Sequence, residues 1–346
     1  MSAPARAQGV TYCEVNDVSA CAGPSTTPHD DISGSSQRQI EQRLEQLRCE
    51  GSNDPACAGG AAADSVSYEG LGVFVSADYQ HKDKTATNFE LGYESDSVGP
   101  TIGVDYRLGT SGVIGGAFDY NHVFGDYKGS YGDFDTDSFT FVLYGSYYPT
   151  DQSFIDLALG TGPKHFENDH VDEGGGPSRV GGATDGFEFT ADLSGGYDFS
   201  FGAFTVGPRV GLHYKRTELN SFTETSADPA AITNTYLDQE DDSFTGTIGA
   251  QASYAISTSF GVVVPQINAE YVREFLDSRE SQSAILDCCG PATFKLDQPD
   301  RNHFNLGAGV VVVLPDGISP FLNYEAEVAN YLEETHTVTA GVRMGF

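Results

Sequence analysis

The sequence predicts an all-β fold: a 12-stranded antiparallel transmembrane β-barrel that follows a short, disulfide-bearing N-terminal segment with one helix. Three observations predict it. From about residue 69 onward, apolar residues alternate with polar residues or glycine over stretches of ten or more residues, longer than the strands of soluble sandwiches. The connections between these stretches are alternately tight and long. The last stretch ends the chain on an aromatic residue, Phe346, as outer-membrane barrels commonly do.

The composition divides the chain into residues 1–66, an extracytoplasmic segment, and residues 67–346, the barrel. The first part is rich in Ser, Pro, Ala, Gly and Asp and carries four of the six cysteines. Its opening contains Ala5-x-Ala7, the small-residue pattern of a signal-peptidase site, so we expect the mature chain to begin at Gln8.

One helical pattern lies in this N-terminal part. Ser36 and Gln39 have the spacing of a capping box, and Gly51 and Pro55 follow as stop signals. We therefore expect a helix over residues 36–49. Three apolar residues share one face of it at spacings of four and three: Ile40, Leu44 and Leu47.

The cysteines suggest an oxidising compartment. The first four form two C-x7-C units that resemble each other, and the last two are adjacent; the disulfide candidates are Cys13, Cys21, Cys49, Cys57, Cys288 and Cys289. Local bridges 13–21 and 49–57 are favoured, and a crossed 13–57, 21–49 pairing is the rival. The adjacent pair forms either a vicinal disulfide or two thiols. A zinc site is disfavoured, because the spacing is unlike that of the usual ligands.

Twelve strands are expected, and their alternation is clearest in the fifth to eighth. They cover residues 69–81, 87–107, 112–127, 134–149, 153–167, 184–200, 203–219, 240–256, 259–275, 301–314, 317–331 and 334–346. Long connections at 168–183, 220–239 and 276–300 alternate with tight turns, which predicts outer loops and periplasmic turns. An even number of strands then places both ends of the barrel in the periplasm.

The polar face of these strands is expected to line the lumen. The lumen-lining candidates are Asp105, Arg107, Asp192, Arg209, Lys215, Glu270, Glu325 and Arg343. They would form a polar channel, or a seat for the cationic helix residues Arg38, Arg43 and Arg48; the structural alternative is a set of ion pairs that satisfy one another.

The charge balance excludes nucleic acid as a partner. Eighteen basic residues stand against 50 acidic ones, a net charge of −32, whereas nucleic-acid binding needs a basic face. The histidines are scattered without a serine at a lipase spacing, so we expect no enzyme, no cofactor and no metal site. The acidic stretches 133–137, 165–173 and 238–242 could bind divalent cations through oxygen ligands, but a hydrated acidic collar is favoured.

One stretch resembles the opening of the autotransporter β-domain family. It holds Gly99, Gly103, Asp105, Tyr106 and Arg107, followed by a tight turn and a glycine-rich strand, and the terminal residues 339–346 look like the end of that family. The resemblance implies a twelve-stranded outer-membrane barrel threaded by a helix, which helps to carry an N-terminal passenger to the cell surface. Its expected partners are outer-membrane lipid and the barrel-assembly machinery. The assembly machinery is expected to bind the C-terminal strand, which ends at Phe346.

Autotransporter passengers usually have hundreds of residues, whereas about 66 precede this barrel. We therefore expect an autotransporter-like barrel that threads or displays its own short N-terminal segment. Two alternatives remain. The barrel could bind a partner, a second copy of itself or a surface protein, through the N-terminal segment or the acidic outer loops, or it could be a small passive pore.

Overall fold

In the computed structural model, the described residues are 38–44, 47, 70–87, 89–171, 178–276, 281–287, 290–298 and 300–345. All six cysteines, Phe346 and the proposed mature start at Gln8 lie outside these ranges, as do the outer parts of the expected helix. The disulfide pairings and the role of the terminal aromatic therefore stay predictions.

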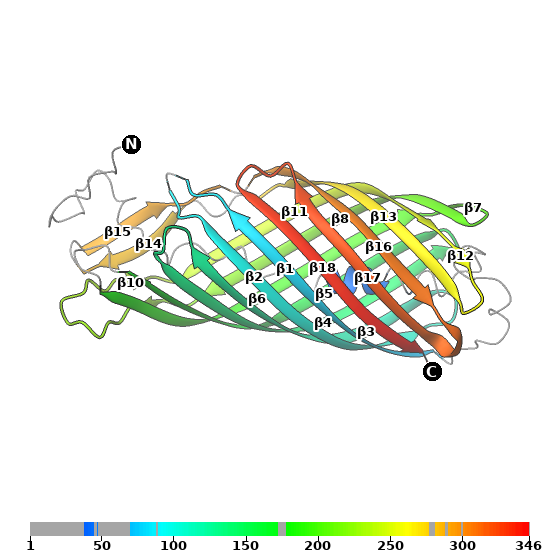
Figure 1. Ribbon diagram of the computed structural model, residues 1–346, viewed down its shortest axis with the longest axis horizontal. Helices are drawn as coiled ribbons and strands as arrows, with labels where there is room; N and C mark the ends of the chain where they lie inside the picture. Colours follow the sequence, from blue (N-terminus) through cyan, green and yellow to red (C-terminus); the bar gives the residue numbers. More distant parts are fainter. Residues whose placement is uncertain are drawn as a thin grey trace.

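The strands form one closed antiparallel barrel (Figure 1). Fourteen strand segments belong to this sheet. Two of them are short hairpin extensions, β7 (Phe199–Phe201) and β12 (Ile256–Ser257). The other twelve form a ring, which is closed by the pairing of β8 with β11. The twelve are β1 (Leu71–Lys84), β2 (Tyr93–Arg107), β3 (Gly112–Tyr127), β4 (Gly132–Thr150), β5 (Ser153–Val171), β6 (Arg179–Tyr197), β8 (Phe204–Leu219), β11 (Gln239–Tyr254), β13 (Val262–Glu274), β16 (Asn302–Val313), β17 (Ile318–Val328) and β18 (Glu333–Gly345). The predicted fold is confirmed.

The period of two separates an apolar exterior from a polar interior. Large apolar side chains cover the outside, among them Ile102, Leu143, Ile248 and Ile267, each more than half exposed. Such a continuous apolar surface is unfavourable in water and suits the hydrocarbon of a bilayer. Between them, the inward positions are buried and frequently charged. No helix among the described residues is long and apolar enough to cross a membrane.

The two ends of the barrel differ. Tight turns join β2 to β3, β4 to β5 and β16 to β17, the last through a single 3-10 turn, η5 (Pro315–Gly317). The C-terminal end of β18 lies at this turn end, and the long loops lie at the opposite end (Figure 1). One expected loop is shorter than predicted: β5 and β6 stay paired up to Val171 and Arg179, so most of residues 168–183 is strand.

A second sheet, which we name the loop sheet, stands at the long-loop end. It has the order β15 (Gly290–Lys295), β14 (Ser281–Leu286), β10 (Thr235–Tyr236) and β9 (Phe222–Thr223). The predicted loops 220–239 and 276–300 therefore contain paired strands. Its inner face holds a separate apolar cluster of Phe222, Tyr236, Ala284, Leu286 and Phe294. An apolar cluster of its own explains why these short strands pair here.

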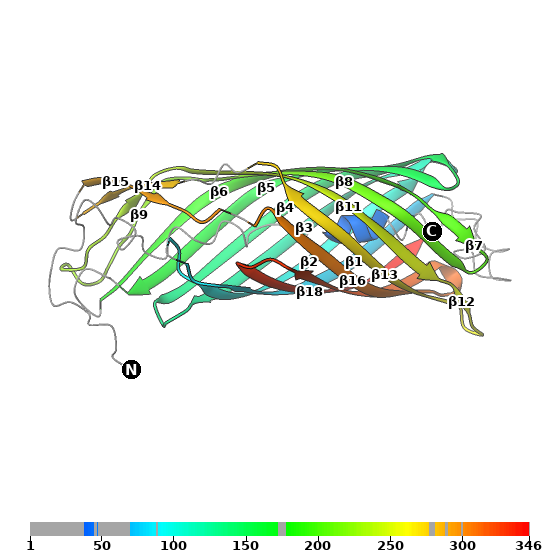
Figure 2. The ribbon, with the colours of Figure 1, turned by 90° about the horizontal axis from the view of Figure 1, so that it is seen from above.

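The helix lies inside the barrel. Residues 38–44 and 47 are helical, in agreement with the centre of the predicted range 36–49. Figures 1 and 2 show this helix enclosed by the strands in two perpendicular views, nearer to the turn end than to the loop sheet.

Candidate functional site

The apolar face of the helix packs against an apolar patch on the barrel wall, which we name the helix seat. Ile40, Leu44 and Leu47 are almost completely buried there. The wall residues of the seat come from β1, β3, β4 and β5: Phe74, Val113, Ala117, Val142, Tyr144 and Ala158. The sequence pattern identified the helix residues but missed the wall residues, because we expected inward positions to be polar.

Gln39 attaches the first turn of the helix to β1 and β2. Its amide donates to the carboxylate of Asp78 and, at 3.2 Å, to the backbone carbonyl oxygen of Gly99. Its own side-chain oxygen accepts a hydrogen bond from the Ser76 hydroxyl. All three side chains are at least 95% buried, so these bonds form away from bulk water and are costly to leave unmade.

Arg43 forms a buried ion pair one turn later. Its Nε donates to Asp105 Oδ2 at 2.8 Å, and both side chains are 1% exposed. The guanidinium also lies 5.3 Å from the centre of the Phe74 ring, within cation–π range. Arg343, on β18, approaches the other oxygen of Asp105 at 3.7 Å. Two of the predicted lumen-lining residues, Asp105 and Arg343, therefore act together on the helix.

The contacts along β2 define the direction of the helix. Gln39 meets Gly99 in the middle of β2, whereas the carbonyl oxygen of Leu47 accepts a hydrogen bond from Arg107, the last residue of β2, at 2.7 Å. Since β2 runs toward a tight turn, the C-terminal end of the helix faces the turn end. Its N-terminal end faces the long loops.

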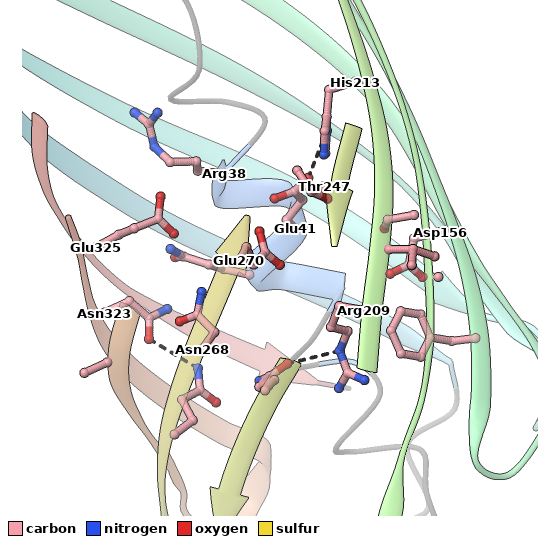
Figure 3. Close-up of a pocket in the computed structure, with 18 of the residues that line it drawn as sticks. Arg38, Glu41, Asp156, Arg209, His213, Thr247, Asn268, Glu270, Asn323 and Glu325 are labelled. Atoms are coloured by element: carbon pink, nitrogen blue, oxygen red, sulfur yellow. Dashed lines mark hydrogen bonds and ion pairs between the residues drawn. The ribbon is translucent and has the colours of Figure 1, made fainter. Parts of the chain in front are cut away.

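A small cavity lies beside the helix, bordered by its residues Arg38, Glu41 and Gln42 (Figure 3). It has a volume of about 120 Å³, enough for several waters. Three more predicted lumen-lining residues border it: Arg209, Glu270 and Glu325. Arg209 is bonded to Asp198 at 2.6 Å and lies 4.8 Å from the centre of the Phe154 ring.

His213 joins the helix to the wall at the edge of this cavity. Its Nδ1 lies 3.0 Å from Asp192 Oδ1, on β6, and 3.5 Å from Glu41 Oε1, on the helix. Among the described residues, these three form the one group of His, Cys, Asp and Glu whose potential ligand atoms all lie within 4.8 Å of one another. Asp192 was predicted as lumen-lining; His213 and Glu41 were not singled out.

The last lumen candidate, Lys215, lies on β8 opposite Ser243 of β11 and Thr190 of β6. The predicted lumen set thus falls into a group at the helix seat, a group at the cavity and this lysine.

Most described residues of the acidic stretches lie in strands, and several of them form ion pairs. Asp133 and Asp169 bind Arg179 at 3.1 and 2.5 Å, and Asp137 lies 3.0 Å from His122. His165, at the start of the stretch 165–173, is in β5, where it lies 2.7 Å from Asp185. Cations of the chain itself therefore already face these carboxylates, which favours the hydrated collar over a divalent-cation site.

Comparison with known proteins identifies the family. Residues 73–325 match the family described as "Autotransporter beta-domain", which is most of the chain. The chain belongs to the autotransporter β-domain family. The predicted resemblance is confirmed, and the protein is a barrel of the bacterial outer membrane. Comparison with curated proteins gives no match.

Solved structures of autotransporter barrels share the fold at low sequence identity. The translocator domain of NalP from Neisseria meningitidis is 14% identical, with a TM-score of 0.64 and coverage of 90% of this chain and 96% of that one. The β-domain of the Bordetella autotransporter BrkA is 18% identical, with a TM-score of 0.61 and coverage of 80% and 100%. The transport unit of AIDA-I from Escherichia coli is 9% identical, with a TM-score of 0.52 and coverage of 88% and 99%.

Proposed function

We propose that this barrel holds its own N-terminal segment in its bore and displays that segment at the cell surface. In this proposal, residues 1–66 are a short passenger, residues 67–346 are the translocator, and the helix is the anchor between them. The observation that carries the proposal is the helix inside the lumen, fixed by its apolar seat and by the buried Arg43–Asp105 pair.

The direction of the helix supports display over retention in the periplasm. Because its N-terminal end faces the long loops, a chain that continues in the direction of the helix leaves the barrel at that end. Long loops are extracellular and tight turns periplasmic in barrels of this membrane. It follows that both ends of the barrel are periplasmic, with β18 available there to the barrel-assembly machinery. The four cysteines of the segment remain candidates for disulfides.

The test is antibody access to an epitope inserted between residues 28 and 29, on intact cells. We expect the antibody to bind before the outer membrane is permeabilised. The control carries the same epitope at Gly109, in the tight turn between β2 and β3, where a Cβ on this residue would meet nothing within 4 Å. That epitope should be reached only after permeabilisation.

Access to the first epitope only after permeabilisation would overturn the display proposal, provided that the barrel is folded. Folding is checked by the difference in mobility between heated and unheated samples on SDS gels. Early access at both sites would indicate a leaky membrane, and early access at Gly109 alone would show that the barrel lies in the opposite orientation.

The prediction that the protein is not an enzyme stays a prediction. The proposed function requires no chemical step, because it uses only contacts between the helix and the wall.

A further inference from the structure

Three metal-ligating groups from distant parts of the chain converge beside the helix. Glu41 comes from the helix and His213 from β8 (Figure 3), and Asp192 comes from β6. Two of the three donors are carboxylates, which repel each other unless a positive charge lies between them. The third is the imidazole Nδ1, and a histidine nitrogen is a common metal ligand.

The distances fit a metal site. Tetrahedral Zn²⁺ with bonds of about 2.0–2.1 Å holds neighbouring ligand atoms about 3.3–3.4 Å apart. Here Nδ1 of His213 lies 3.0 Å from the Asp192 oxygen and 3.5 Å from the Glu41 oxygen. Small side-chain rotations would therefore place a metal ion between the three donors. We propose that Glu41, Asp192 and His213 bind a divalent transition-metal ion of the Zn²⁺ type.

The surroundings of the three donors supply a second, independent reason. Gln42, next to Glu41 on the helix, borders the adjoining cavity, and its Oε1 is buried with no hydrogen-bond partner among the described residues. A buried acceptor of this kind calls for a donor, and a water held in the adjoining cavity would supply one. The 120 Å³ cavity has room for a water in the fourth coordination position.

The charge of the cavity also favours a cation. Four carboxylates border it, and two guanidiniums oppose them, of which Arg209 is already bonded to Asp198. The carboxylates are Glu41, Asp156, Glu270 and Glu325. Such an excess of negative charge in a partly enclosed space raises the local concentration of cations.

The donor set selects the kind of metal. Ca²⁺ and Mg²⁺ prefer six or more oxygen ligands, whereas one imidazole with two carboxylates suits Zn²⁺ and its neighbours in the transition series. The metal would connect Glu41 on the helix with β6 and β8, the strands that follow β5 of the helix seat around the barrel. It would thereby hold the helix in the bore from a second side, whether or not the N-terminal segment is displayed.

The experiment is a Zn²⁺ titration of the folded full chain in detergent, in competition with a chromophoric chelator, after the cysteine thiols have been alkylated. We expect one Zn²⁺ per chain that an excess of Ca²⁺ does not displace. Glu41→Gln and His213→Gln should each weaken binding at least about tenfold. In a second measurement, Zn²⁺ should slow trypsin cleavage after Arg38 and Arg43 in the wild type and not in Glu41→Gln.

The matched control is His81→Gln. His81 forms a comparable pair with Asp96 at 2.9 Å on the outside of the barrel, but no third donor from the described part of the chain is close enough to form a ligand group there. This variant should bind Zn²⁺ like the wild type. Equal binding by the wild type and Glu41→Gln would overturn the proposal, and so would no binding by either. Glu41 belongs to the helix, so this substitution leaves the strands intact and the test valid even if His213→Gln folds poorly.

Discussion

The buried pair of Arg43 and Asp105 illustrates how single residues hold the helix. Removing an ion pair from water is expensive, and the attraction of the two charges offsets this cost only when the geometry is good. The wall provides that geometry: Asp105 faces Arg43 on one side and Arg343 on the other. Asp105 also belongs to the Gly-rich run by which the sequence resembles its family, so one residue of that run has a role as a helix anchor.

Replacing Asp105 by Asn should release the helix. The substitution leaves Arg43 and Arg343 as two buried positive charges without their shared carboxylate, and breaking a buried pair in this way costs about 3–5 kcal/mol. We expect trypsin to cleave after Arg38 and Arg43 at least tenfold faster than in the wild type. The cleavage products can be followed by mass spectrometry on the detergent-solubilised protein.

The control for this substitution is Asp96→Asn, which removes an outward carboxylate from His81 and Tyr79. It should leave the cleavage rate unchanged. A wild-type rate in Asp105→Asn would show that the apolar seat alone retains the helix.

Glycines and aromatic residues form a second set of specific contacts. Five inward aromatic rings lie over the glycine directly opposite on the next strand. A side chain on any of these glycines would meet the ring at less than 3 Å; the pairs are Phe74–Gly103, Tyr144–Gly115, Phe134–Gly125, Phe154–Gly196 and Phe321–Gly341. The ring fills the space that the glycine leaves, which accounts for part of the high glycine content of the strands.

Gly103→Ala tests this pairing. The added Cβ would lie 2.3 Å from the Phe74 ring and 2.9 Å from the Gly116 carbonyl oxygen, so the ring must leave its place beneath the helix. Overpacking of this kind costs about 1–3 kcal/mol. We expect a lower midpoint temperature for loss of the folded, fast-migrating band on SDS gels.

Gly116→Ala serves as the comparison on the neighbouring strand, because its Cβ would meet nothing closer than 3.7 Å. Both variants replace a glycine by alanine and therefore restrict the backbone to the same extent. The difference between their midpoint temperatures then measures the steric effect. Equal midpoints would refute the ring–glycine explanation.

At the scale of elements, the strands could be predicted from the sequence and the contacts between distant elements could not. In a strand such as β8, consecutive side chains point to opposite faces of the sheet. The alternation of apolar and polar residues therefore locates the strand to within a few positions. Phe74 lies on the same inward face as Asp78, and only the position of the helix explains why one is apolar and the other charged. Likewise, Glu41, Asp192 and His213 have no common pattern along the chain.

The loop sheet was missed for the same reason. Its central pairing joins Thr235 to Ile285, two residues from loops that were predicted separately. Strands of two residues, such as β9 and β10, are also too short to show a period.

Substitution of Phe294 by Ala should unfold the loop sheet and spare the barrel. Phe294 is 1% exposed within the separate apolar cluster, and removal of a buried phenyl ring costs about 3–5 kcal/mol. All five residues of this cluster belong to the loop sheet. We therefore expect proteinase K to cleave within residues 276–300 at a concentration that leaves the wild type intact, while the heat-induced gel shift of the barrel stays the same. A lowered barrel midpoint would show that the loop sheet is part of the same cooperative unit.

At the scale of the whole molecule, the helix divides the lumen. The helix packs against the helix seat on β1, β3, β4 and β5. The cavity lies between the helix and the strands β8, β13 and β17. A barrel of twelve strands has a bore of modest width, so one helix takes up much of the cross-section. The passive-pore alternative therefore depends on whether this helix stays in place.

Conductance across a planar lipid bilayer decides this point. The full chain should conduct weakly, and a chain without residues 1–66 should conduct several times better, because water and ions then fill the seat as well as the cavity. A synthetic peptide of residues 36–49, added to the shortened chain, should lower the conductance again. The same peptide with Leu44→Asp should not, since a carboxylate cannot enter an apolar seat in which Leu44 is 2% exposed. Equal conductance of the full and shortened chains would mean that the helix does not close the bore, and the anchor that the display proposal requires would have to lie elsewhere.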